Sequence, residues 1–144
     1  MLIKFHSDQI PHSWDLIKLG LSKSIETDKG DDFNYVLEDL LISKKECWII
    51  VEEENTDNTY GLVITEFIDD LDFEKLNLLI YSIFFYNSPN SDLVTDAYET
   101  LKKYALYHNC SKIITFSRVP AAIDLCKMLG ADIETRKIIF DIGG

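Results

Sequence analysis

The feature that most constrains the fold is a nearly continuous apolar stretch at residues 76–86, LNLLIYSIFFY. Successive side chains of a strand point to opposite faces, and both alternating sets of this stretch are mainly apolar. A strand of this kind must be covered on both sides, so the stretch predicts a central strand between two layers of helices. The chain has 144 residues and 47% hydrophobic content. It is long enough to bury such a core as one domain over residues 1–144.

Hydrophobic periodicity predicts short strands and amphipathic helices around this strand. Before it we expect a strand, a helix capped by Ser13, a helix opening at Asp31 or Asp32, and a two-stranded antiparallel hairpin. These elements span residues 2–5, 13–27, 31–45, 47–52 and 60–68. After it come a long helix, a strand at residues 112–116, a helix at residues 120–129 and one closing strand at residues 133–142. The order favours an α/β (α+β) fold, with a mixed sheet and helices on both faces.

Charge and cysteine usage exclude several classes of protein. The net charge of −11 makes a nucleic-acid partner unfavourable, because phosphate neutralisation needs a clustered basic surface. No apolar run has the length of a membrane span, and residues 1–10 lack the pattern of a secretory signal. The three cysteines are widely spaced, with no CxxC pair, so we expect reduced thiols and no metal site. The expected location is the cytoplasm of a cell.

The loop after the central strand is the first candidate for chemistry. Its sequence, NSPNSD at residues 87–92, ends the strand, and Ser91 or Asp92 can cap the helix that follows. A strand that feeds a helix through a short loop is where many α/β proteins hold phosphates.

The whole order resembles the GNAT superfamily of acyl-CoA-dependent N-acetyltransferases. Residues 101–113, LKKYALYHNCSKI, are similar to the "L..YA...GC..I" helix, turn and strand of GNAT-like proteins often encoded by bacteriophages. Arg118, which precedes the last helix, is a second similarity to that group. The resemblance implies a mostly antiparallel central sheet and acetyl-CoA as the cofactor. It also allows a location in a virion.

The phosphate-binding loop departs from the family pattern. The family signature is Arg or Gln, then x-x-Gly-x-Gly or Ala, and the matching positions here run from Pro89 to Val94. None of the signature residues is present, and Asp92 and Val94 stand where the glycines would be. Asp92 and Asp96 also place carboxylates near the helix N-terminus, where Asp92 would cap the helix in place of a phosphate. We therefore expect acetyl-CoA binding to be weakened or lost.

The resemblance also implies catalytic positions. Glu66, near the end of its strand, is the candidate general base, and Cys126 stands where the family often has a tyrosine that protonates the departing thiolate. The structural alternatives are a solvated glutamate and a small residue packed under the last helix. If acetyl-CoA binds, the resemblance places its contacts at Ile83, Phe85, Tyr86, Asn90, Ser91 and Leu93.

Three functions follow as hypotheses. The first is a GNAT-like binding or virion-associated module, the second an active N-acyltransferase, and the third a small-ligand binder that uses the same cleft. A protein partner or self-association is expected for the first, because the closing strand would leave an open sheet edge. The contact surface would then include residues 133–142, or the cleft beside Tyr86 and Arg118.

Overall fold

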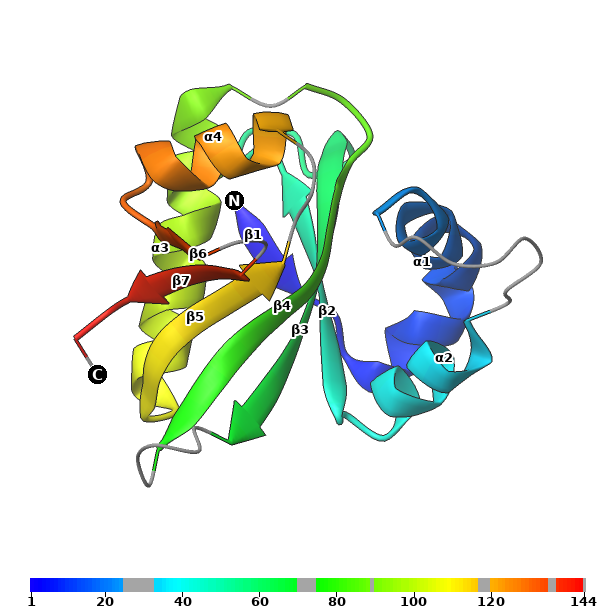
Figure 1. Ribbon diagram of the computed structural model, residues 1–144. Coiled ribbons are helices and arrows are strands. Elements are labelled where there is room, and N and C mark those ends of the chain that lie inside the picture. The colour runs from blue at the N-terminus through cyan, green and yellow to red at the C-terminus, as the bar shows by residue number, and fades with distance from the viewer. Residues whose placement is uncertain (25–32, 70–74, 89, 117–119, 135–136, 144) are drawn as a thin grey trace.

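The computed structural model describes residues 1–24, 33–69, 75–88, 90–116, 120–134 and 137–143. Within them, seven strands form one sheet in the order β1-β2-β3-β4-β5-β7-β6 (Figure 1). The strands are β1 Leu2–Lys4, β2 Lys45–Val51, β3 Thr59–Asp69, β4 Leu76–Phe85, β5 Cys110–Phe116, β6 Asp132–Glu134 and β7 Lys137–Asp141. The helices are the 3-10 helix η1 Ser7–Gln9, α1 Ile10–Ser24, α2 Asn34–Leu41, α3 Ser91–Tyr107 and α4 Pro120–Met128.

The strand β4 lies in the middle of the sheet, as its two apolar faces predict. It pairs antiparallel with β3 and parallel with β5, and the other neighbouring strands pair antiparallel. The mixed, mostly antiparallel sheet, the β2–β3 hairpin and the helix between β4 and β5 are therefore confirmed.

Helices cover both faces of the sheet (Figure 1). One core cluster joins α3, through Ala97, Leu101 and Ala105, to sheet residues such as Val63 and Ile80. The other joins α1 and α2 to the opposite face, and its fully buried members include Ile17, Leu21, Val36, Leu62 and Ile64. The helices α1, α2 and α3 bury apolar residues of the stripes that their sequence periodicity indicates.

The sheet opens beside the second half of β4. The described β4–β5 pairs run from Leu76 to Ile80 of β4, and the last joins Ile80 to Thr115. On the other side of β4, the β3 pairing shifts register between Ile64 and Thr65, so that Tyr81 is the extra residue of a β-bulge. A bulge bends a strand and re-aims its side chains. β4 therefore separates from β5 near the middle of the sheet.

Two predicted helix starts are wrong. The helix expected from Ser13 begins at Ile10 and contains Pro11 in its first turn. Proline is tolerated there because the first N–H groups of a helix have no partner within it. The cap of α3 is Asn90, one residue before the predicted Ser91 or Asp92. Asp31 and Asp32, expected to open α2, lie outside the described residues.

The closing strand predicted at residues 133–142 is wrong as a single element. The structure divides this segment into β6 and β7, which pair antiparallel with each other. β7 lies between β5 and β6, so Ile139 faces Ile114 on one side and Asp132 on the other. The predicted open edge of this strand is thus covered, and the edge of the sheet is the three-residue β6. An edge this short limits pairing with another chain.

Candidate functional site

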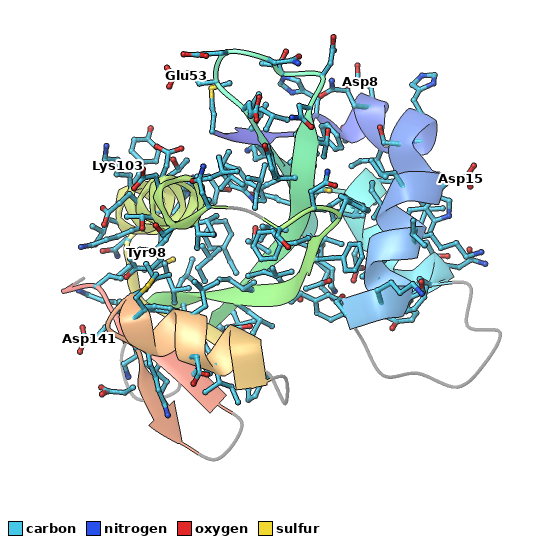
Figure 2. The ribbon with its side chains drawn as sticks, turned by 90° about the horizontal axis from the view of Figure 1, so that it is seen from above. Asp8, Asp15, Glu53, Tyr98, Lys103 and Asp141 are labelled. Atoms are coloured by element: carbon cyan, nitrogen blue, oxygen red, sulfur yellow. The ribbon has the colours of Figure 1, made fainter. Side chains whose placement is uncertain are left out.

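A cavity of about 650 Å³ lies where β4 separates from β5. Its walls come from the second half of β4, from α3 and α4, and from the end of β5. Figure 2, seen from above, shows α3 and α4 together on one side of β4 and α1 on the other. A volume of this order is typical of small-molecule sites.

β4 lines the cavity from both of its faces. Ile83 pairs with Val63, a member of the core cluster that joins α3 to the sheet, and Phe85 packs against the same cluster. Ser82 and Phe84 turn toward α1, because the Ser82 hydroxyl hydrogen-bonds Ser24 and Phe84 lies next to Gly20. Since all four β4 residues line the cavity, it continues past β4 toward α1.

Polar side chains line the cavity at several places. Lys23 and Ser24 of α1, with Ser82 of β4, form its α1 end. Deeper inside, the Thr115 hydroxyl donates to the Ile80 carbonyl at 3.0 Å. Tyr98 of α3 also lines the cavity, and burial raises the pKa of its phenol.

The N-terminus of α3 is closed by its own cap. The Asn90 side-chain oxygen accepts a hydrogen bond from the Leu93 backbone N–H at 2.7 Å. The Asp92 carboxylate is exposed in the first turn and does not make this bond, which corrects the expectation that Asp92 caps the helix. One of the N–H groups that could hold a phosphate at this helix end is therefore bonded within the chain.

The structure separates the two residues predicted to be catalytic. Cys126 of α4 lines the cavity, and burial raises the pKa of its thiol. A raised pKa keeps the thiol protonated at neutral pH, so it can donate a proton and is a poor nucleophile. Glu66 is not among the residues that line the cavity. Its carboxylate lies 3.2 Å from the ammonium group of Lys45.

Glu66 belongs to a structural ion-pair network. Lys45 is 6% exposed, and its ammonium also lies 2.6 Å from Asp39 of α2 and 4.8 Å from the centre of the Tyr81 ring. The hydrogen bond from Lys45 lowers the pKa of Asp39. Burial alone would lower the pKa of Lys45, but the hydrogen bonds and charges of Asp39 and Glu66 outweigh it and the pKa is raised. A carboxylate held in this way is poorly placed to accept a substrate proton.

The six predicted coenzyme contacts divide equally. Ile83, Phe85 and Ser91 line the cavity. Asn90 is the cap of α3, and Leu93 packs against the core cluster that joins α3 to the sheet. The remaining residue, Tyr86, donates its hydroxyl to the Leu16 carbonyl at 2.9 Å, and burial raises the pKa of its phenol to about 12.

Sequence reasoning missed several lining residues. Lys23 and Ser24 come to the cavity only because α1 packs across β4, and no local pattern marks them. Ser82 did carry a signal, since it is a hydroxyl inside an apolar run and is only 5% exposed. A polar residue in such a place needs a partner, which here is Ser24.

Two further searches concern the described residues alone. Among them, no group of three or more His, Cys, Asp or Glu side chains could hold a metal ion. In the same part of the chain, none of the helices combines the length and the apolar character needed to span a membrane.

Comparison with known proteins gives a consistent result for the fold. No protein-family model matches the chain, and no curated protein matches its sequence. Among solved structures, it is similar to aminoglycoside 6'-acetyltransferase type Ii, with a TM-score of 0.71, 12% identity, and coverage of 99% of this chain and 97% of that chain. It is also similar to the ribosomal-protein-alanine N-acetyltransferase from Brucella melitensis biovar Abortus 2308. That structure has a TM-score of 0.71 and 14% identity, with coverage of 93% of this chain and 93% of that chain.

A third similar structure contains the coenzyme. It is a chain of the NatC complex bound to Gag peptide and CoA, with a TM-score of 0.64, 12% identity, and coverage of 98% of this chain and 97% of that chain. At such low identity these likenesses concern the fold. The chain therefore has the fold of the GNAT N-acetyltransferases.

Proposed function

We propose that this protein is a GNAT-fold binding module in which acetyl-CoA binding is weakened or lost while the cavity beside β4 still takes a ligand. The observation that carries the proposal is the N-terminus of α3. There Asn90 occupies the Leu93 N–H, and Asp92 adds a carboxylate to the first turn. A pyrophosphate at this helix end would have to displace the Asn90 side chain from the Leu93 N–H and approach the Asp92 carboxylate.

Both effects oppose an incoming anion. An asparagine cap is worth about 1 kcal/mol to a helix, and this is lost if a phosphate displaces it. A carboxylate in the first turn already satisfies the helix dipole, an interaction of about 0.3–1 kcal/mol, and repels a second negative charge. Val94 stands at the second glycine position of the family signature, and its buried side chain lines the cavity, where a glycine would leave the backbone open to a phosphate.

Calorimetric titration with CoA and with acetyl-CoA tests the proposal. The expected result is a Kd well above the low-micromolar range. Asp92→Asn should tighten residual binding about fivefold, since about 1 kcal/mol of repulsion is removed. Asp15→Asn is the matched control, because Asp15 is exposed on α1 and does not line the cavity. A low-micromolar Kd for acetyl-CoA in the unchanged protein would refute the proposal.

An active acyltransferase is the second candidate, and the opening between β4 and β5 favours it. The cavity beside β4 could accept a thioester, with Cys126 as the group that protonates the departing thiolate. Mass spectrometry of a panel of amines incubated with acetyl-CoA would detect transfer. Acetyl transfer whose rate falls at least tenfold in the Cys126→Ala protein would support this candidate. If no amine is acetylated, acyltransferase activity on the amines of the panel is excluded.

A protein partner is the last element of the proposal. The resemblance of residues 101–113 to phage-encoded proteins supports a role inside an infected cell or in a virion. The cleft beside Tyr86 is the candidate surface, because the three-residue edge strand β6 limits pairing with another chain. Arg118, the other residue expected at this surface, lies outside the described residues. Sedimentation velocity, and mass spectrometry of the particle with which the chain purifies, test this element. A strictly monomeric protein with no stoichiometric companion would contradict it.

A further inference from the structure

We propose that the cavity binds a long-chain fatty acid, with the hydrocarbon chain between β4, α3 and α4 and the carboxylate at Lys23. The inference rests on the proposed function, since it names the ligand of the same cavity. It is argued from the walls of the cavity, from its course through the molecule and from the charges along it.

The walls are apolar over most of the cavity. α4 contributes Leu125 and Met128, α3 contributes Val94 and Leu101, and β4 contributes Ile83. Ile83 is 38% exposed and Met128 is 58% exposed, which is unusual for large apolar side chains facing one cavity. A ligand that covers them gains the free energy of removing apolar surface from water.

The course of the cavity suits a chain more than a compact ring. One part is lined by Ile138 and Phe140 of β7, and another by Lys23 and Ser24 of α1. β7 and α1 lie on opposite sides of β4 (Figure 1), and Figure 2 separates α1 from α4 in the same way. A single ligand that contacts both parts must pass β4 where the described pairing with β5 ends. A flexible hydrocarbon chain can follow that path.

The charges select the head group. The chain carries 25 acidic residues, yet none of the described residues that line the cavity is acidic, and Lys23 is the cation among them. Lys23 lies in the last turn of α1 and precedes Ser24, whose hydroxyl hydrogen-bonds Ser82, and all three residues line the cavity. A carboxylate there gains an ion pair and nearby donors, whereas an amine would face the lysine. The cavity thus favours an anionic amphiphile over the amine substrates of an N-acyltransferase.

Three twelve-carbon probes differing only in their head groups test the charge selection. Calorimetry with laurate, dodecanol and dodecylamine, below their micelle concentrations, should give the tightest Kd for laurate and the weakest for dodecylamine. Across decanoate, laurate and myristate, each added methylene should tighten the Kd about fourfold until the chain fills the cavity. Dodecylamine binding as tightly as laurate would overturn the assignment of the head group.

Two variants test the position of the ligand. Lys23→Gln should weaken laurate binding about fivefold and leave dodecanol unchanged, because an exposed ion pair is worth up to about 1 kcal/mol. Lys127→Gln is the matched control, since Lys127 is exposed on α4 and does not line the cavity. Ile83→Trp should abolish binding of both probes by filling the cavity, with thermal unfolding as the check that the variant folds.

A second readout needs no variant. Cys126 is partly accessible and lines the cavity, whereas Cys47 and Cys110 are buried. Laurate should therefore slow the reaction of Cys126 with a maleimide, followed by peptide mass spectrometry. Unchanged Cys126 labelling at saturating laurate, or equal laurate affinity in the Lys23→Gln protein, would overturn the inference.

The experiments separate this inference from the proposed function. Tight binding of CoA refutes the proposed function, whatever laurate does. If neither CoA nor any of the three amphiphiles binds, the fatty-acid inference fails while the loss of coenzyme binding stands. Myristoyl-CoA distinguishes the two possible sources of an acyl chain. It should bind more weakly than myristate, and the reverse order would overturn the assignment of a free carboxylate to Lys23.

Discussion

At the scale of single residues, Lys45 is a buried charge that depends on its ion-pair partners. Its ammonium group is buried and has two carboxylate partners, Asp39 and Glu66, on α2 and β3. Removing a buried charge's partner leaves the other charge uncompensated, which costs more than the pair contributes to stability. The three residues tie the end of α2 to the sheet.

We predict that Lys45→Met lowers the free energy of unfolding by about 2–3 kcal/mol, somewhat less than for a fully dry ion pair. Denaturant titration measures this difference. Lys103→Met is the control, because Lys103 is exposed on α3 and makes no ion pair among the described residues. A loss below about 0.5 kcal/mol would show that the network adds little.

The same variant has a defined dependence on pH. The pKa of Asp39 is lowered from 3.8, so its contribution is complete above that value and is lost as pH falls through the lower folded pKa. The pKa of Lys45 is raised from 10.5, so its contribution is complete below that value and is lost as pH rises through the higher folded pKa. The stability difference between the two proteins should be flat from about pH 5 to about pH 9 and shrink below about pH 4. A difference that changes steadily between pH 5 and pH 9 would contradict this assignment.

Single residues also show the limit of sequence reasoning about the site. The family resemblance suggested Cys126 and Glu66 as catalytic residues. The structure places Cys126 on the cavity wall, whereas Glu66 lies outside the lining residues and pairs with Lys45. Asn90, Ser91 and Asp92 are all good caps, so the choice among them depends on where β4 ends and α3 begins. Local propensity does not decide that, because element boundaries depend on tertiary packing.

At the scale of elements, the close approach of β3 and β4 depends on Gly61. A Cβ atom at Gly61 would lie 2.8 Å from the Phe84 carbonyl oxygen and 2.9 Å from the Phe85 ring. A Cβ atom at Gly20 of α1 would meet the Tyr86 hydroxyl at 3.3 Å, the end of a side chain. Backbone cannot give way as a side chain can, so the two glycines differ in what they tolerate.

We predict that Gly61→Ala destabilises the protein by about 1–3 kcal/mol, the usual cost of overpacking. Gly20→Ala should change stability by less than about 1 kcal/mol, because the gain in helix propensity offsets the small shift of Tyr86. Thermal unfolding of both proteins checks the contrast. Equal stabilities of the two variants would mean that β4 moves freely away from β3.

The cap of α3 gives a second prediction for an element. Asn90→Ala should cost about 1 kcal/mol, since the Leu93 N–H loses its partner. Asn90→Asp keeps a capping oxygen and adds a charge that the helix dipole favours, so it should cost little or nothing. Circular dichroism during thermal unfolding reports both. If Asn90→Asp loses as much as Asn90→Ala, the cap is not what stabilises this turn.

Elements with a strong periodic pattern could be predicted, whereas those depending on one turn could not. The apolar run of β4 and the β2–β3 hairpin follow directly from local pattern. The division of residues 132–141 into β6 and β7 does not, because both halves have strand propensity and the turn between them has no strong signal. The early start of α1 was missed because Ser13 was taken as the helix cap, whereas Pro11 lies within the first turn.

At the scale of the whole molecule, the net charge of −11 dominates. Mutual repulsion of like charges destabilises a compact state, and salt screens it. We predict that raising NaCl from about 0.01 M to about 0.15 M increases the Tm at neutral pH. The Lys45→Met protein has one positive charge fewer, so its Tm should rise more with the same increase in NaCl. A Tm that falls with added salt would mean that specific ion pairs outweigh the repulsion.

The cavity itself belongs to this scale. Its walls come from α1, α3, α4 and the strands β2, β3, β4, β5 and β7, which are distant in the sequence. The sequence predicts β4 and α3, but the meeting of Ser24 with Ser82 depends on how α1 crosses the sheet. That part of the site could only come from the folded molecule.

The insertion of β7 between β5 and β6 has a consequence for biosynthesis. β5 has one neighbour, β4, until residues 137–141 arrive, and β6 has none in the sheet before then. A nascent chain that has emerged only as far as β6 therefore exposes the backbone edge of β5, with its buried residues Ile113 and Ile114 beside it. The arrival of β7 thus completes the described sheet, and a ribosome that pauses shortly before β7 holds a chain prone to capture by chaperones or by other nascent chains.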